Sequence, residues 1–206
     1  MKNLFLTTVA LFVLSAPGAA QAQQWFDFNG QALTPDAIGG TLEMVSTITN
    51  DGSIETPLPL TGSISDRYTL VINGLQLLSD DGTMQMYAGG TIQIIEDDTT
   101  PADFGDMSTF SDGTVILEGT IQQFARIDFG VGGLVSGEGS VDWTGGSRIN
   151  EIAPADRLAW ALVVSISTRA SVLIDGYDEN WNGKVEPGDP IVSDGATTWG
   201  QLKKTY

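Results

Sequence analysis

The stretch Tyr68-Thr69-Leu70-Val71-Ile72 decides the fold class, because its largest apolar side chains fall on every second residue. Successive side chains of a β-strand point to opposite faces, so Tyr68, Leu70 and Ile72 share one face. That face is apolar and can be buried against a core. The stretch therefore predicts a β-strand with one buried side.

Similar short runs lie on both sides of this stretch and are separated by turn sequences. The turn sequences are Asn50-Asp51-Gly52, Asp80-Asp81-Gly82, Asp112-Gly113 and Asp175-Gly176. The runs between them cover residues 42–49, 67–72, 83–87, 91–95, 114–118, 121–129 and 139–143. Short strands at such spacing are typical of antiparallel sandwiches and barrels. We expect an all-β fold, a jelly-roll-like antiparallel β-sandwich over residues 23–174.

Residues 157–167 fit two readings. Leu158, Trp160, Leu162, Val164 and Ile166 alternate as in a strand, whereas Pro154-Ala155-Asp156 is a possible helix start. The β-branched second half favours a buried strand. Gly-Gly pairs at 39–40, 89–90 and 145–146 are interpreted as close turns or bulges at strand starts.

Residues 1–22 have the features of a secretory signal peptide. A positive start at Lys2 leads into an apolar run over residues 4–14 and a small-residue tripeptide that ends at Ala22. We expect cleavage after Ala22 and a secreted or periplasmic protein. The apolar run is short for a transmembrane span and no later segment qualifies, so membrane insertion is not expected.

The composition excludes several functional classes. The chain has 26 Asp and Glu against 9 Lys and Arg, which gives a net charge of −17 and disfavours nucleic acid as a partner. It has no His and no Cys. Ser-His-Asp hydrolysis, cysteine nucleophiles and histidine-bound zinc are therefore excluded. No catalytic motif is present, and we expect a protein that is not an enzyme.

Residues 178–189 have the ligand spacing of a calcium loop. Ca²⁺ takes six to eight oxygen ligands, which an EF-hand loop supplies from positions 1, 3, 5, 7, 9 and 12, with glycine at position 6. Gly183 stands at position 6. The candidate ligands are the side chains of Asp178, Asn180, Asn182, Glu186 and Asp189 and the backbone carbonyl of Lys184. The spacing predicts Ca²⁺ as a structural cofactor.

This segment resembles the dockerin form of the EF-hand, whose pattern is D-x-N-x-[DN]-G-x-[VI]-x-x-x-D. The resemblance covers the twelve residues only, and Trp181, Pro187 and Pro190 depart from the pattern. Dockerins carry two such loops, and a second loop is absent from this sequence, so cohesin binding is not implied. We expect residues 175–206 to wrap one calcium ion and then to form a short helix over residues 199–206, packed on the same domain.

The weaker patterns leave alternatives open. Glu96, Asp97, Asp98, Asp103 and Asp106 form an acidic loop that is either solvated or a second cation site. Trp181 and Tyr177 are the aromatic residues that we expect to be exposed for stacking on sugars.

The first functional hypothesis is a secreted calcium-binding protein with a structural or interaction role. The alternative is an extracellular carbohydrate-binding module or a carboxylate-based glycan hydrolase. The partner is an unknown protein or polysaccharide.

Overall fold

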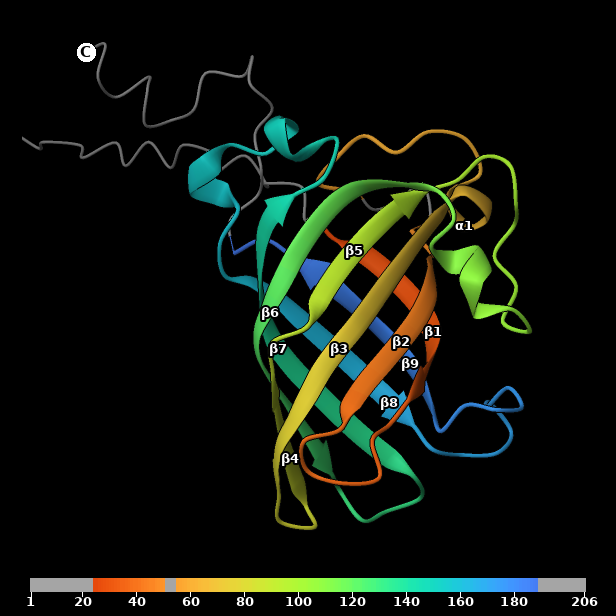
Figure 1. Cartoon of the computed structure of the whole chain (residues 1–206), viewed down its shortest axis with the longest axis vertical. Helices are drawn as coiled ribbons and strands as arrows, with labels where there is room; N and C mark the ends of the chain where they lie inside the picture. The colour runs from red at the N-terminus through yellow and green to blue at the C-terminus, as the bar shows by residue number, and fades with distance from the viewer. Residues whose placement is uncertain (1–23, 51–54, 189–206) are drawn as a thin grey trace, which may run out of the picture.

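The computed structural model describes residues 24–50 and 55–188, and these residues form an antiparallel β fold with few helices (Figure 1). The strands are β1 (Phe26–Leu33), β2 (Thr41–Ile48), β3 (Tyr68–Asp80), β4 (Met84–Ala88), β5 (Thr91–Glu96), β6 (Thr114–Asp128), β7 (Leu134–Gly145), β8 (Trp160–Ser167) and β9 (Glu179–Glu186). The helices are α1 (Ile64–Arg67) and the 3₁₀ helices η1 (Met107–Phe110), η2 (Ile149–Glu151) and η3 (Pro154–Asp156).

The sheet closes on itself. Strands that follow one another in the chain pair antiparallel, except β4 and β5, and β9 pairs with β1 in a register that sets Trp181 opposite Gly30. Strands β4 and β5 both lie between β3 and β6, so the ring is an 8-strand β-barrel. The all-β antiparallel prediction is confirmed, but the jelly-roll sandwich is wrong. Alternating strands look alike in both architectures, and only the β1–β9 pairing distinguishes them.

A kink at Gly89-Gly90 separates β4 from β5. Both glycines have positive φ angles, 72° and 77°. A Cβ atom on Gly90 would lie 2.7 Å from the backbone nitrogen of Leu75. The prediction of a close turn before a strand is confirmed here and at Gly39-Gly40, whereas Gly145 ends β7. The kink lets one passage of the chain line the barrel as two short strands.

The barrel interior is filled by apolar side chains. The largest fully buried ones in this interior are Trp143, Trp160, Trp181, Tyr68, Tyr87, Phe26, Phe28, Phe124, Leu42, Met44 and Ile48. All of these belong to one core cluster. Gly137 makes room for one of the rings, because a Cβ atom there would lie 2.3 Å from Cζ of Phe124. The interior is thus a packed core, as eight-stranded barrels allow.

A second, smaller cluster lies outside the barrel wall. Val45, Val71 and Ile95 are buried although they alternate with the inward-facing residues of their strands. Phe110 of η1 covers them, together with the partly buried Phe104. The segment between β5 and β6 therefore packs against the outer face of the sheet.

The strand predicted over residues 157–167 is confirmed as β8. The signal peptide of residues 1–22 and the helix predicted over residues 199–206 lie outside the described residues. Strand β9, from the C-terminal segment, is part of the barrel. None of the helices in residues 24–50 and 55–188 is both long enough and apolar enough to cross a membrane.

Candidate functional site

The stretch predicted as a calcium loop is largely a β-strand. Residues Glu179–Glu186 form β9, with Glu179, Trp181 and Val185 buried inside the barrel. An EF-hand loop curls around its ion, whereas residues 179–186 are extended and paired with β1 and β8. The predicted loop conformation is therefore wrong. Trp181, Gly183 and Val185 alternate along the segment as the inward-facing residues of a barrel strand do. Strands β1 and β8 pair with this strand on its two sides.

The predicted calcium ligands have separate partners. Asp178 Oδ2 accepts a hydrogen bond from the Thr34 backbone N–H at 2.8 Å, and Asn180 Nδ2 donates to the Gly30 carbonyl at 3.0 Å. Lys184 Nζ donates to Glu186 Oε2 at 2.6 Å. Asn182 is exposed, and Asp189 lies outside the described residues. Within residues 24–50 and 55–188, no group of three or more acidic side chains is arranged to hold a metal ion.

The acidic loop after β5 uses its carboxylates to hold its own backbone. Asp97 Oδ1 accepts from the Thr99 N–H at 2.7 Å, and Asp106 Oδ1 accepts from the Ser108 N–H at 3.1 Å. Asp103 Oδ1 accepts from the Gly105 N–H at 2.8 Å. Hydrogen bonds from Thr99 and Ser108 lower the pKa values of Asp97 and Asp106. The second cation site that the sequence left open is not formed by these described residues, since their carboxylates serve turns.

Of the two aromatic residues expected to be exposed, Trp181 is buried and Tyr177 is partly buried. Trp181 is 0% exposed and stacks on Phe124 inside the barrel. Tyr177 packs edge-on against Phe104, and its hydroxyl donates to the Phe104 carbonyl at 3.1 Å. The expectation that these two residues form a sugar-stacking platform is therefore wrong.

A buried ion pair crosses the barrel interior. Arg126 of β6 donates from Nε to Glu179 Oε1 of β9 at 2.7 Å, and the Glu179 side chain is 2% exposed. Trp181 Nε1 donates to the other carboxylate oxygen, Oε2, at 2.9 Å. Both oxygens of the carboxylate are satisfied, and the pair ties separate walls of the barrel together.

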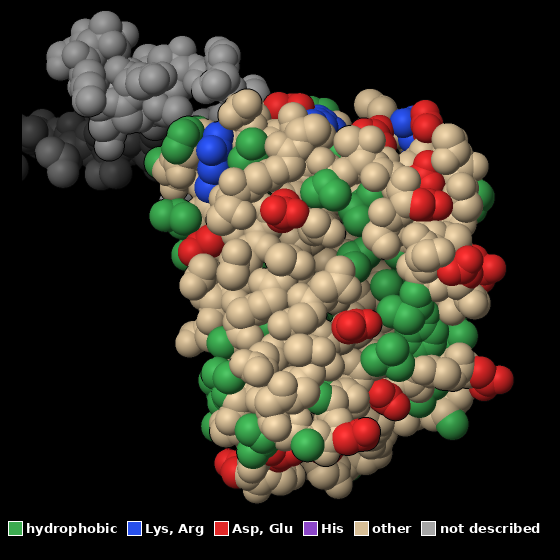
Figure 2. Space-filling model, viewed as in Figure 1, with side chains coloured by type: hydrophobic (Ala, Val, Ile, Leu, Met, Phe, Trp, Pro, Cys, Tyr) green, Lys and Arg blue, Asp and Glu red, His purple; other side chains and the backbone are tan. Residues whose placement is uncertain are grey.

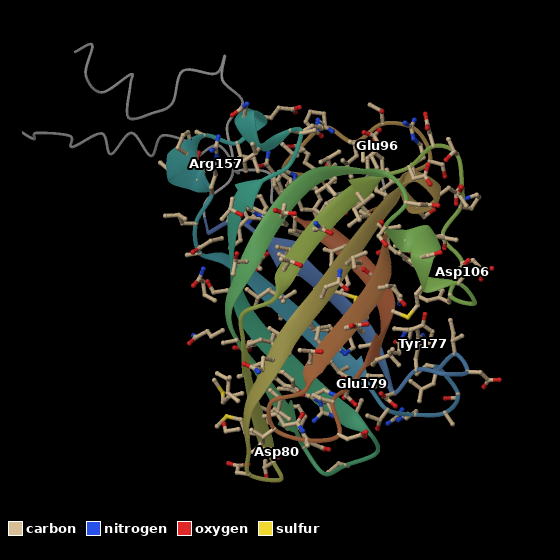
Figure 3. The ribbon with its side chains drawn as sticks, viewed as in Figure 1. Asp80, Glu96, Asp106, Arg157, Tyr177 and Glu179 are labelled. Carbon is tan, nitrogen blue, oxygen red and sulfur yellow. The ribbon has the colours of Figure 1, made fainter. Side chains whose placement is uncertain are left out.

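A polar pocket of about 450 Å³ lies at the end of the barrel where β5 ends and β6 begins. Figure 3 shows Glu96 at this end and Asp80 at the opposite end. The pocket is lined by Arg67, Glu96, Asp98, Thr114, Ile116, Ser147 and Arg148. In Figure 2 the Lys and Arg side chains in view lie at this upper end, whereas Asp and Glu are scattered over the face.

Arg67 forms one wall of the pocket. Its Nη2 atom lies 3.0 Å from Glu96 Oε1 and 3.9 Å from Asp98 Oδ2. Glu96 Oε1 also accepts a hydrogen bond from the Tyr68 hydroxyl at 2.9 Å. Arg67 Nε is buried and has no hydrogen-bond partner among the described residues. A buried donor of this kind is unusual, because most find a partner.

Arg148 forms the opposite wall and is held by Glu151. The two side chains make two parallel hydrogen bonds, each of 2.7 Å, and Arg148 Nη2 also donates to the Pro59 carbonyl at 3.1 Å. Hydrogen bonding to Arg148 lowers the pKa of Glu151, and the same pairing raises the pKa of Arg148. The guanidinium therefore keeps its charge and its orientation.

Gly146 sets the position of this wall. Its φ angle is 102°, and a Cβ atom there would lie 2.4 Å from the Ile116 carbonyl oxygen. The backbone N–H groups of Ser147 and Arg148 donate to the carbonyls of Val115 and Ile116 at 3.0 Å each. Only glycine allows the end of β7 to lie this close to the start of β6.

Sequence reasoning named Glu96 and Asp98 only within the acidic loop, as a possible second cation site, and missed the pocket. The signal that was present is the scarcity of basic residues, 9 in a chain of 206. In a protein with so few basic residues, each arginine is a candidate for a specific ion pair or binding contact. The pairing of Arg67 with Glu96 joins residues 29 positions apart, which no local pattern shows.

Comparisons with protein-family models, with curated proteins and with solved structures each found no match to this chain. Its function is therefore inferred from the pocket itself.

Proposed function

We propose that this protein binds a small polar solute in the pocket between Arg67 and Arg148 and does so without catalysis. The observation that carries the proposal is a pocket of about 450 Å³ with two guanidinium groups, two carboxylates and two hydroxyl side chains in its wall. Pockets for small molecules have volumes of about 300–1,000 Å³. A solute with several hydrogen-bonding groups fits this wall.

The same features disfavour an apolar ligand. Eight-stranded barrels hold such ligands in an open interior, but here Trp143, Trp160 and Trp181 fill the interior. Ile116 is the single apolar side chain among the pocket residues. A lipid-like molecule would have to desolvate the charged groups of the wall without replacing their hydrogen bonds, which costs free energy.

Binding is favoured over catalysis by the chemistry of the wall. The chain has no His or Cys, and Glu96 Oε1 accepts hydrogen bonds from both Arg67 and Tyr68. In this setting the carboxylate holds the guanidinium in place. The features of residues 1–22 further support the proposal that the protein is exported and meets its solute outside the cytoplasm.

The test is a binding screen followed by nuclear magnetic resonance. Sugars, amino acids and small organic acids are added at millimolar concentration to the isotope-labelled protein. We expect at least one solute to shift the amide signals of Thr114 and Ser147. In Ser147→Phe, which fills the pocket, these shifts should disappear.

Ser165→Phe, on the exposed outer face of β8, is the matched control and should bind as the parent protein does. The proposal is overturned if no solute in any class shifts these amide signals, or if the Ser147→Phe variant binds with unchanged affinity.

A further inference from the structure

We infer that the solute is a small zwitterion, of the size and chemistry of a free amino acid. This inference rests on the proposed binding function and narrows its ligand class. It is carried by the two signs of charge that face each other in one pocket, Arg67 and Arg148 against Glu96 and Asp98.

The carboxylate of the ligand would be held by Arg67. A guanidinium has five N–H donors and prefers planar, two-point contact with a carboxylate. Glu96 Oε1 accepts from Nη2 of Arg67 and Nε is buried, so a ligand would meet the exposed remainder of the guanidinium. The Arg67 side chain is 30% exposed, so part of the group is reachable from the pocket.

The ammonium of the ligand would be held by Asp98. Its side chain is 72% exposed, and its distance of 3.9 Å from Arg67 Nη2 is too long for a hydrogen bond. The Asp98 carboxylate thus keeps its acceptor capacity, whereas Oε1 of Glu96 already accepts hydrogen bonds from Arg67 and Tyr68. Arg67 and Asp98 lie next to each other, as the two charged ends of an amino acid do.

The net charge of the protein and the unmatched groups in the pocket disfavour the two kinds of singly charged ligand in different ways. A net charge of −17 repels an anion before it reaches Arg67. A cation without a carboxylate is attracted, but it leaves the donors of Arg67 unmatched. A zwitterion has no net charge, and its two charged ends pair with Arg67 and Asp98.

The experiment compares four probes by calorimetric titration: L-alanine, L-alaninamide, N-acetyl-L-alanine and D-glucose. They are a zwitterion, a cation, an anion and an uncharged polar solute of small size. We expect L-alanine to bind about fivefold more tightly than either singly charged analogue, since exposed ion pairs contribute modestly. D-glucose should bind more weakly than L-alanine.

Asp98→Asn should weaken the binding of L-alanine and of L-alaninamide about threefold. It should leave N-acetyl-L-alanine unchanged or bound more tightly, because a repelling charge has been removed. Asp98→Glu should restore the parent preference. Asp36→Asn, at an exposed position in the loop between β1 and β2, is the control and should change nothing.

Two outcomes separate this inference from the proposed function. If D-glucose or a singly charged analogue binds in the pocket as tightly as L-alanine, the inference of a zwitterionic solute is wrong and the proposed binding function stands. If none of the four probes binds and the wider screen of solutes also fails, the proposed function falls and this inference falls with it.

Discussion

Phe124 of β6 and Trp181 of β9 stack across the barrel interior, with ring centroids 5.2 Å apart and an interplanar angle of 22°. Arg126 lies two residues after Phe124 in β6, and Glu179 lies two residues before Trp181 in β9. These two side chains form the buried ion pair. The two contacts join walls that are not neighbours in the sheet. They fill the half of the barrel away from the pocket and fix its cross-section.

Glu179→Gln should destabilise the protein by about 3 kcal/mol, because it leaves the Arg126 guanidinium buried without a counter-charge. Urea denaturation measures the loss. Arg126→Met combined with Glu179→Leu should recover most of the stability, since an apolar pair needs no charge partner. Glu138→Gln, at an exposed position of β7, should stay within about 0.5 kcal/mol of the parent. Equal stability of Glu179→Gln and the parent would show that the pair is not buried in solution.

Gly137→Ala should destabilise the barrel by about 1–3 kcal/mol, because the added methyl group meets the Phe124 ring at 2.3 Å. Thermal unfolding measures the change. Phe124→Leu in the same chain removes the clash, so the double variant should lose less than the sum of the two single losses. Gly188→Ala, which has open space around it, is the control. Full additivity would contradict the contact.

Tyr87 should make the protein sensitive to alkali. Burial raises the pKa of its hydroxyl from 10.0 to about 12. The neutral form is favoured in the fold, so its contribution to stability is complete below pH 10 and is lost as the pH rises towards 12. Over this range the free energy of unfolding should fall by about 2 kcal/mol because of Tyr87.

Tyr87→Phe should remove that part of the alkaline loss. A residual slope is expected from Tyr177, whose pKa is also raised by burial. Urea denaturation at pH 9, 10 and 11 gives the slopes. Identical pH profiles of the variant and the parent would rule out the buried hydroxyl as the cause.

Gly146→Ala should abolish binding at the pocket while the protein still folds. The substitution forces either the positive φ angle of 102° or the 2.4 Å contact with Ile116 to change, at a cost of about 1–3 kcal/mol. Ser147 and Arg148 then move away from the other wall. Gly145→Ala, whose nearest new contact is 3.7 Å from Glu118, should bind normally. Calorimetry and thermal unfolding, run on both variants, distinguish the two effects.

Calcium should not change the melting temperature. The residues from Glu179 to Glu186 form a strand that is paired on both sides, and such a strand cannot curl around an ion without breaking the barrel. Melting curves with excess calcium and with a chelator should coincide. An increase of several degrees in calcium, lost in Asp178→Ala, would show that the segment closes as a loop and that the strand is wrong.

The β-strands were predicted well from the sequence, but the closure of the sheet into a barrel was not predicted. Alternation at Tyr68, Leu70 and Ile72 located β3, and the turn at Asp80-Asp81-Gly82 located the β3–β4 connection. These signals are local, since they depend on a period of two and on positive φ angles. The contact of β1 with β9 joins residues 147 to 159 positions apart, and no local pattern carries it.

Residues 178–189 show how a local pattern misleads. Asn and Asp at alternate positions satisfy a calcium loop and equally satisfy the outer face of a strand, where polar side chains meet water. The inward series of Trp181, Gly183 and Val185 was the competing signal, with glycine opposite the Phe28 ring. The ring of β-strands decided between the two, because β1 and β8 would each have one unpaired edge without β9.

Strand β9 hydrogen-bonds to both β1 and β8. During synthesis those two edges stay unpaired until residue 186 has emerged, long after β1 was made. Open strand edges pair readily with other chains. The nascent chain thus has a long interval in which it is prone to aggregate, and a delivery route that keeps it unfolded until it is complete would avoid that interval.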